Sequence, residues 1–154
     1  MSNIVLARID DRLIHGQVMT AWVQYTGGNE IVIADDKVAN DPFLSAVITG
    51  AVPKHLKAEA MTLEKAADYL KKEKDNEDKK FIVLAKGPEA YESLIEKGVD
   101  ITEINLGGMG SKQERSKLYK NISASDSERE LFKKIMAQNV HVYIPVSYTH
   151  LTLP

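Results

Sequence analysis

The sequence predicts one α/β domain with an open, mainly parallel central sheet and helices on both faces. Short, almost wholly apolar runs recur along the chain, as expected for strands buried on both faces of a parallel sheet. Segments with apolar residues at helical spacing lie between these runs, and glycine, proline or aspartate separates the two kinds of segment. The length of 154 residues suits a single domain, which we place at 1–146, with 147–154 as an atypical tail.

The first half of the chain alternates predicted strands with predicted helices. Gly27 and Gly28 stop the first helical pattern. Asp41 and Pro42 open the second, because proline is favoured in the first turn of a helix, and Thr62 is expected to cap the third. The expected strands are 4–7, 31–34 and 57–61, and the expected helices carry apolar residues at Val18, Trp22 and Tyr25, at Phe43, Leu44, Val47 and Ile48, and at Leu63, Ala66, Ala67 and Leu70.

The second half continues this alternation and ends in a strand. Ser127 and Glu130 have the spacing of a capping box, in which a serine and a later glutamate satisfy backbone N–H groups at a helix start. Apolar residues alternate with His141 and Tyr143, which indicates a strand with one buried face. The expected strands are 81–85, 101–106 and 140–144, with a short additional strand at 119–124, and the expected helices lie around 90–95 and 131–136.

The composition excludes several classes of function. Lys and Arg number 20 against 22 Asp and Glu, a formal net charge of −2, so nucleic acid is not an expected partner. The absence of cysteine excludes disulfides, thiol catalysis and zinc sites built on cysteine. No apolar run approaches the ~18–20 residues that span a bilayer, and the first residues lack the pattern of a signal peptide. We therefore expect a cytoplasmic protein.

One connection, residues 8–17, concentrates chemically active side chains. Ligands of open α/β sheets bind beyond the carboxyl ends of the strands, where this connection is expected to lie. Arg8 and Arg12 offer forked guanidinium donors that suit phosphate oxygens, and Asp10 lies between them. His15 supplies a nitrogen nucleophile that is largely neutral at pH 7, which makes it a candidate covalent acceptor of a phosphoryl group.

The start of the first helix favours an anion at the same place. Gly16 and Gln17 begin this helix, and its unpaired N–H groups and positive dipole end would face a phosphoryl group held on His15. A second interpretation remains open, in which the charged residues form surface ion pairs and His15 only caps a turn. The residues alone support the two interpretations equally.

The same residues carry a family resemblance. The segment 8–18, RIDDRLIHGQV, closely resembles the phosphorylation-site motif of IIB components of the mannose class of the bacterial sugar phosphotransferase system, also called the mannose/fructose/sorbose class. The similarity extends from residue 3 to about residue 144. Supporting matches are the aspartates 35–36, the segment 83–88 (VLAKGP) and the segment 104–109 (INLGGM).

The resemblance implies a phosphocarrier enzyme that needs no cofactor or metal. His15 would accept a phosphoryl group on its Nδ1 atom from a phosphohistidine of the IIA protein or domain. It would then pass the group to a sugar that enters through the IIC/IID membrane permease, with which the protein would associate peripherally. The motif arginines map onto Arg8 and Arg12, which would steady the phosphoryl group, and Asp10 would orient an arginine or the imidazole. A homo-oligomer is compatible with the sequence.

Further candidates for phosphate binding lie after later strands. Gly108 belongs to a glycine-rich segment, 107–112, that lacks the G-x-x-x-x-G-K-[ST] spacing of a P-loop, so a turn beside the active loop is the alternative role. Lys86 follows a central strand, and simple exposure at the strand end is its alternative. His55, His141 and His150 lack neighbouring ligands for a metal.

Two other functions compete with the phosphocarrier. In a receiver-like domain, Asp10 and Asp11 would hold Mg²⁺ beside Lys86, but Thr62, not an aspartate, follows the third predicted strand. In a passive binding module, the arginines and the helix start would hold a small anion without a covalent step.

The two ends of the chain lead to separate expectations. The family usually continues after residue 146 with a segment containing Pro and Asp, whereas this chain reads SYTHLTLP at 147–154, so we leave the tail out of the predicted fold. The closeness of Met1 to the first strand favours a free IIB protein over part of a longer IIAB chain.

Overall fold

The computed structural model describes residues 3–14, 16–119, 122–146 and 149–152. The strands in this part of the chain are β1 (Ile4–Asp10), β2 (Glu30–Ala34), β3 (Lys57–Met61), β4 (Phe81–Ala85), β5 (Glu103–Gly108), β6 (Ser116–Tyr119), β7 (Ile122–Ala124), β8 (His141–Val146) and β9 (Thr149–Thr152). The helices are α1 (Gly16–Thr26), α2 (Asp36–Ala39), α3 (Pro42–Gly50), α4 (Leu63–Lys72), α5 (Pro88–Glu96) and α6 (Asp126–Met136).

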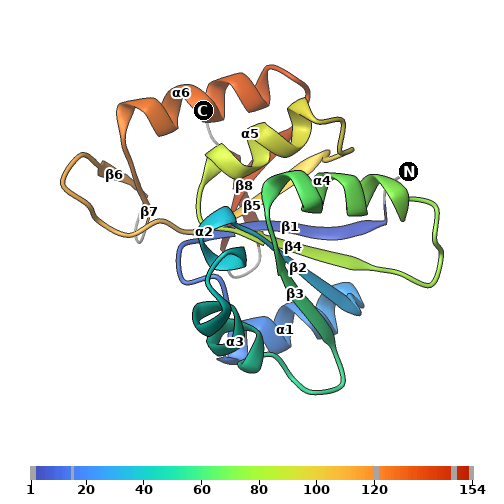
Figure 1. Cartoon of the computed structure of the whole chain (residues 1–154). Coiled ribbons are helices and arrows are strands. Elements are labelled where there is room, and N and C mark those ends of the chain that lie inside the picture. Colours follow the sequence, from blue (N-terminus) through green and yellow to red (C-terminus); the bar gives the residue numbers. More distant parts are fainter. Residues whose placement is uncertain (1–2, 15, 120–121, 147–148, 153–154) are drawn as a thin grey trace.

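The predicted α/β fold with a mainly parallel sheet is confirmed. Within the described residues, seven strands form one sheet in the order β3-β2-β4-β1-β5-β8-β9. Neighbouring strands run parallel except β9, which pairs antiparallel with β8. Helices α4, α5 and α6 cover one face of the sheet, and α1 and α3 lie on the other (Figure 1). None of the described helices has the length and apolar character needed to cross a membrane.

Hydrophobic side chains fill the space on both faces of the sheet. Leu6 belongs to the cluster that includes Met19 of α1, whereas Ala7 and Ile9 belong to the cluster that includes Leu94 of α5. Successive residues of a strand point to opposite faces, so Arg8 and Asp10 share the α1 face with Leu6. This alternation sends the two charged side chains of β1 to the same side of the sheet.

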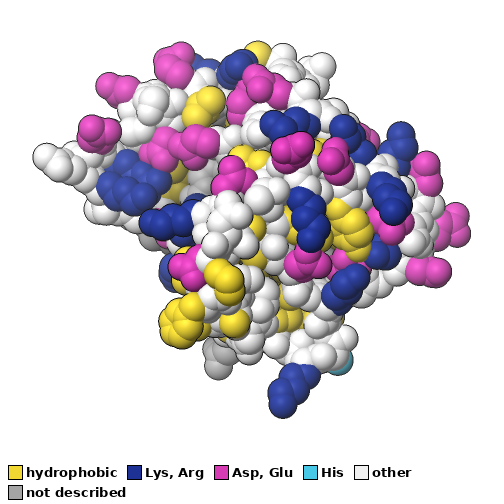
Figure 2. All heavy atoms as spheres, in the orientation of Figure 1, with side chains coloured by type: hydrophobic (Ala, Val, Ile, Leu, Met, Phe, Trp, Pro, Cys, Tyr) yellow, Lys and Arg dark blue, Asp and Glu magenta, His cyan; other side chains and the backbone are white. Residues whose placement is uncertain are grey.

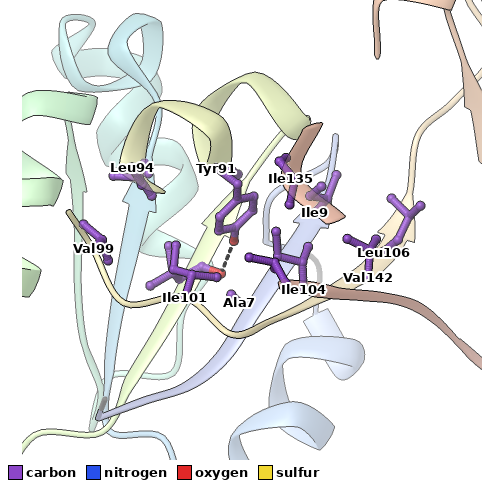
Figure 3. Close-up of a cluster of buried hydrophobic side chains, with 14 of the residues drawn as sticks. Ala7, Ile9, Tyr91, Leu94, Val99, Ile101, Ile104, Leu106, Ile135 and Val142 are labelled. Atoms are coloured by element: carbon purple, nitrogen blue, oxygen red, sulfur yellow. Dashed lines mark hydrogen bonds between the residues drawn. The ribbon is translucent and has the colours of Figure 1, made fainter. Parts of the chain in front are cut away.

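A buried tyrosine ties α5 to the central strands. Tyr91 is fully buried, and its hydroxyl lies 2.9 Å from the carbonyl oxygens of both Arg8 and Val83. Figure 3 shows its ring pointing from α5 into the cluster near Ile9. Burial raises the pKa of the Tyr91 hydroxyl, so the group stays a neutral donor to these carbonyls.

The expected helix starts are confirmed for α3 and α4 and wrong for α6. Asp41 accepts a hydrogen bond from the backbone of Leu44 (3.0 Å), and Thr62 accepts one from the backbone of Lys65 (3.1 Å). In α6 the capping box is Ser125 and Glu128, one pair earlier than the predicted Ser127 and Glu130. Both pairs fit the same sequence pattern, and the position at which the chain leaves β7 selects the first pair.

Several elements differ from those expected. In place of the single strand predicted at 119–124 there are two strands, β6 and β7, which form their own antiparallel sheet among the described residues. Helix α2 was not predicted, because its four residues are too few to show a helical pattern; Asp35 caps it by accepting from the backbone of Val38 (2.9 Å). Residues 149–152 of the tail pair with β8, whereas the predicted fold ends at residue 146.

Strand β1 also extends beyond its predicted end at residue 7. The polar residues 8–17 suggested a connection, but Arg8 and Asp10 are buried in the strand, at 7% and 1% exposed. Opposite charges at alternate positions of one strand face can pair, which makes their burial tolerable. The chemically active segment therefore begins on the central sheet.

The carboxyl ends of β1 and β5 form the switch point of the sheet. After β1 the chain continues through α1 to β2 on one side of the central strand, and after β5 it continues through β6, β7 and α6 to β8 on the other side. The two connections therefore diverge from neighbouring strands, which is where open α/β sheets bind their ligands.

Side chains of both charges are interspersed over the face that Figure 2 shows, in keeping with the net charge of −2. Hydrophobic side chains gather over α3, where Phe43 and Val47 are 77% and 56% exposed.

Candidate functional site

The carboxylate of Asp10 joins two arginines at the carboxyl end of β1. Its Oδ1 atom accepts from the backbone N–H (3.1 Å) and the Nε atom (3.0 Å) of Arg12. Its Oδ2 atom accepts from Nη2 of Arg12 (3.0 Å) and from Nη2 of Arg8 (3.2 Å). Arg12 therefore binds Asp10 in the bidentate manner that restricts a guanidinium most strongly.

The ionised form of Asp10 is favoured by this arrangement. Burial alone raises the pKa of this carboxyl, but the hydrogen bonds from the side chain and backbone of Arg12 and the charges of Arg8 and Arg12 outweigh it. The pKa of Asp10 therefore lies below its usual value. At neutral pH the side chains of Arg8, Asp10 and Arg12 together carry two positive charges and one negative charge, so these three groups have a net positive charge.

Arg8 is held on several sides beneath the surface. Its Nη1 atom donates to Oδ1 of Asn105 on β5 (2.7 Å), and its guanidinium carbon lies 5.4 Å from the centre of the Trp22 ring on α1. A Cβ atom at Gly107 would lie 2.1 Å from that carbon, so the guanidinium occupies space that only glycine leaves free. Arg8 thus holds Asp10 in place from within the protein interior.

Arg12 presents its charge to solvent. Its side chain is 53% exposed, whereas the Asp10 side chain that it binds is 1% exposed. Hydrogen bonding to Asp10 raises the pKa of the Arg12 guanidinium, and its Nη1 atom has no hydrogen-bond partner within the described part of the chain. Arg12 is therefore an oriented cation with donor capacity left for an anionic ligand.

A tight turn follows Asp10. The backbone N–H of Leu13 donates to the carbonyl of Asp10 (2.8 Å), and Leu13 adopts a φ of 60° in the left-handed region. Leu13 and Ile14 are buried, which offsets the strain of that conformation. Helix α1 begins at Gly16, as predicted. His15 lies outside the described residues, as does the side chain of Gln17.

The segment after β5 packs against this turn. The carbonyl of Gly108 accepts from the backbone N–H of Asp11 (3.0 Å), and the N–H of Gly110 donates to Oδ2 of Asp11 (2.7 Å). A Cβ atom at Gly108 would lie 3.3 Å from Oδ1 of Asp10. The structure thus brings the predicted Gly108 beside Asp10 and Asp11.

Lys86 directly follows β4, the strand that pairs with β1. Ile9 pairs with Ala85, so Asp10 and Lys86 are the next residues along the two neighbouring segments. The Lys86 side chain is half-buried and makes no hydrogen bond or ion pair with the other residues that the structure describes. Nor do those residues contain three or more His, Asp or Glu side chains grouped to hold a metal ion.

Some residues that support the site are not predicted from the sequence alone. Asn105 is fully buried and binds Arg8, and Trp22, predicted only as an apolar helix residue, stacks on the same guanidinium. A polar residue inside the apolar run 104–106 was the available signal for Asn105. Arg115 and Glu128 had no comparable signal, because their pairing depends on how the segment after β5 folds back onto the first turn of α6.

Comparisons with known proteins all lead to one family. Residues 4–146 match the family model described as "PTS system sorbose subfamily IIB component". The chain is 34% identical over 140 residues to the "PTS system fructose-specific EIIB component" of Bacillus subtilis (strain 168), covering 91% of this chain and 85% of that protein.

A longer relative and a solved structure agree with this match. The chain is 33% identical over 141 residues to the "PTS system mannose-specific EIIAB component" of Escherichia coli (strain K12), covering 92% of this chain and 43% of that protein. The crystal structure of the IIB domain of the sorbose permease from Klebsiella pneumoniae superposes with a TM-score of 0.89 at 30% identity, covering 99% of this chain and 92% of that one.

Proposed function

The chain belongs to the sorbose subfamily of phosphotransferase-system IIB components, whose general role is phosphoryl transfer from IIA to sugar, and from this premise we propose that His15 carries the phosphoryl group. One observation carries the proposal. The buried carboxylate of Asp10 fixes the exposed guanidinium of Arg12 at the carboxyl end of β1, three residues before His15 and four before the start of α1. An oriented cation (Arg12), a nucleophile (His15) and a helix start (Gly16) thus follow one another in a single short segment.

The proposed reaction is two successive displacements at phosphorus. In the first, an imidazole nitrogen of His15, assigned as Nδ1 by the family resemblance, attacks the phosphoryl group of a phosphohistidine on IIA. The N–P bond to IIA breaks as the N–P bond to His15 forms, and the IIA imidazole keeps the electron pair. In the second, a sugar hydroxyl oxygen attacks, the N–P bond to His15 breaks, and the hydroxyl proton is released.

The arginines have different roles in this proposal. Arg12 faces the solvent and stabilises the negative charge of the phosphoryl group in both transfers. Arg8 is buried and acts through Asp10, which it holds in place, so we propose it as a positioning residue. The N–H groups of Gly16 and Gln17 at the start of α1 and the ammonium of Lys86 would add positive potential, and Gly108 would hold Asp11 through its carbonyl.

The proposed partners follow from the names of the relatives. The mannose-specific relative is an EIIAB component that this chain matches over less than half its length, which supports IIA as the phosphoryl donor. The sorbose relative is described as a domain of a permease, which supports the IIC/IID permease and its incoming sugar as the acceptor side. We propose peripheral association with that permease.

The test is to incubate the protein with a phosphorylated IIA partner and map the added mass. We expect one phosphoryl group on His15, lost in acid and retained in alkali, as for a phosphoramidate. A base-labile adduct on an aspartate would support a receiver-like domain instead. A complete lack of covalent adduct would support a passive anion-binding module.

We expect Arg12→Ala to slow acceptance of the phosphoryl group by about 10²-fold, because the variant loses the oriented charge that faces the phosphoryl group. Its free energy of unfolding should fall by only about 1 kcal/mol, since the Arg12 side chain is half exposed. Rapid-quench transfer from phospho-IIA and urea unfolding measure the two effects. Arg12→Lys keeps the charge but loses the bidentate contact, so its transfer rate should lie between those of wild type and Arg12→Ala. An unchanged transfer rate in Arg12→Ala would remove Arg12 from the mechanism.

A further inference from the structure

Arg115, in the connection between β5 and β6, is the centre of a second charged cluster beside the site. Its Nε and Nη2 atoms donate to the two carboxylate oxygens of Glu128, at 2.8 and 2.7 Å. Its Nη1 atom donates to the carbonyl of Gly110 (2.9 Å) and lies 3.7 Å from Oδ2 of Asp11. The Arg115 side chain is 6% exposed, so the guanidinium is buried although it belongs to a connection between strands.

Glu128 gives this cluster a rigid base. The same carboxylate that binds Arg115 accepts from the backbone N–H of Ser125 (2.9 Å) as part of the capping box of α6. Burial raises the pKa of Glu128, but the hydrogen bonds from Arg115 and Ser125 outweigh it, so the pKa is lowered and the group is ionised at neutral pH. The first turn of α6 thus fixes the orientation of Arg115.

Asp11 connects the cluster to the turn that precedes His15. Its Oδ2 atom accepts a hydrogen bond from the backbone N–H of Gly110, and the carbonyl oxygen of Gly110 accepts one from Arg115. Gly110 therefore links the side chains of Asp11 and Arg115. A Cβ atom at Gly110 would lie 3.3 Å from the same Oδ2 atom, which leaves little room for another arrangement. Asp11 lies between Asp10 and Arg12, so a shift of its backbone would displace both ends of the bidentate ion pair.

We infer that Arg115 is a positioning residue for the phosphoryl transfer, acting through Gly110 and Asp11 on the turn that carries Arg12 and leads to His15. The inference rests on the proposed function. It follows from the two connections at the switch point, one after β1 and one after β5, which begin at the ends of neighbouring strands. The described contacts between these connections include those of Asp11 with Gly108 and Gly110. Arg115 and Glu128 join these contacts to α6 and so set the distance between the two connections.

The test is single-turnover transfer from phospho-IIA to the full chain, measured over a range of IIA concentrations. All variants are compared at a temperature where their unfolding curves show them folded. The amplitude of transfer counts the competent molecules, and the rate constant at saturating IIA reports the geometry of the site. Arg115→Gln should lower that rate constant about tenfold and leave the half-saturating IIA concentration within about twofold of wild type.

The matched control is Arg129→Gln. Arg129 also donates from α6 to β6, to the carbonyl and hydroxyl oxygens of Ser116, but no described contact joins it to Asp11. Its replacement should leave the rate constant at the wild-type value. A purely structural role for Arg115 would lower only the amplitude and leave the rate constant of the folded molecules unchanged, which would overturn the inference.

Asp11→Ala removes the Asp11 end of the link between Arg115, Gly110 and Asp11. This variant tests the inference if Arg115→Gln does not fold. It should reproduce the slow rate constant, and the double variant should be no slower than the slower single variant, because both changes break one link. A wild-type rate in Asp11→Ala, or effects that multiply in the double variant, would overturn the inference. A wild-type chain that accepts no phosphoryl group would contradict the proposed function itself, which is a separate outcome.

Discussion

Replacement of His15 by alanine is expected to abolish acceptance of the phosphoryl group from phospho-IIA. Alanine has no nitrogen nucleophile, so the N–P bond cannot form and the covalent adduct should fall by more than about 10³-fold, below detection. Arg8, Asp10 and Arg12 remain in this variant, so if the site is only a passive anion-binding site, it would still bind phosphate. Intact-protein mass after incubation with phospho-IIA measures the adduct, and circular dichroism shows that the variant is folded.

His141→Ala is the matched control for this experiment. His141 is the first residue of β8, at the amino end of a parallel strand and so at the opposite edge of the sheet from the switch point, and its imidazole lies 3.6 Å from the Glu103 carboxylate. We expect His141→Ala to accept the phosphoryl group as the wild type does. An adduct of wild-type yield on His15→Ala would show that another residue is the acceptor.

The largest effect on stability is expected for Asp10→Ala. The carboxylate is 1% exposed and is the anion that compensates the buried Arg8 guanidinium. Its removal leaves a buried charge without its counter-ion, which typically costs about 3–5 kcal/mol in free energy of unfolding. Arg12 also loses its bidentate partner, so phosphoryl transfer should slow in the molecules that remain folded. Urea unfolding at pH 7 measures the loss of stability.

A double variant separates the charge from simple loss of packing. Arg8→Met with Asp10→Ala removes both charges, so it should cost less than the sum of the two single variants, by about 1–3 kcal/mol. Additive losses would show that the two side chains act independently. A loss below about 1 kcal/mol in Asp10→Ala alone would mean that water or another group compensates Arg8.

The stabilising effect of Asp10 should depend on pH in one direction. The pKa of Asp10 is lower in the folded protein than its usual value, so its contribution is fully present above the unfolded-state pKa of about 4. The contribution is lost as the pH falls through that value toward the folded-state pKa. The difference in free energy of unfolding between wild type and Asp10→Ala should therefore be constant from about pH 5 to 7 and shrink below about pH 4.

Local pattern predicted most of the strands and helices because their cause is local. An apolar run such as 81–85 becomes a buried strand wherever it lies in a parallel sheet, and β4 covers the same residues. Asp41 and Thr62 cap helices through hydrogen bonds to residues three positions later. The spacing Ser-x-x-Glu failed to identify the start of α6 only because it occurs twice within six residues, at Ser125 and at Ser127.

The order of strands and helices can be predicted from the residues alone, as can the short segment in which Arg8, Asp10, Arg12 and His15 follow one another. For Arg8, Asp10 and Arg12, the burial of the side chains and the groups that hold them depend on the fold. Arg8 is buried because Asn105, 97 residues away, accepts its hydrogen bond, and Asp11 is held by Gly110, 99 residues away. The cost of burying a charge depends on partners brought by neighbouring strands, and no local pattern in the chain records which partners those are.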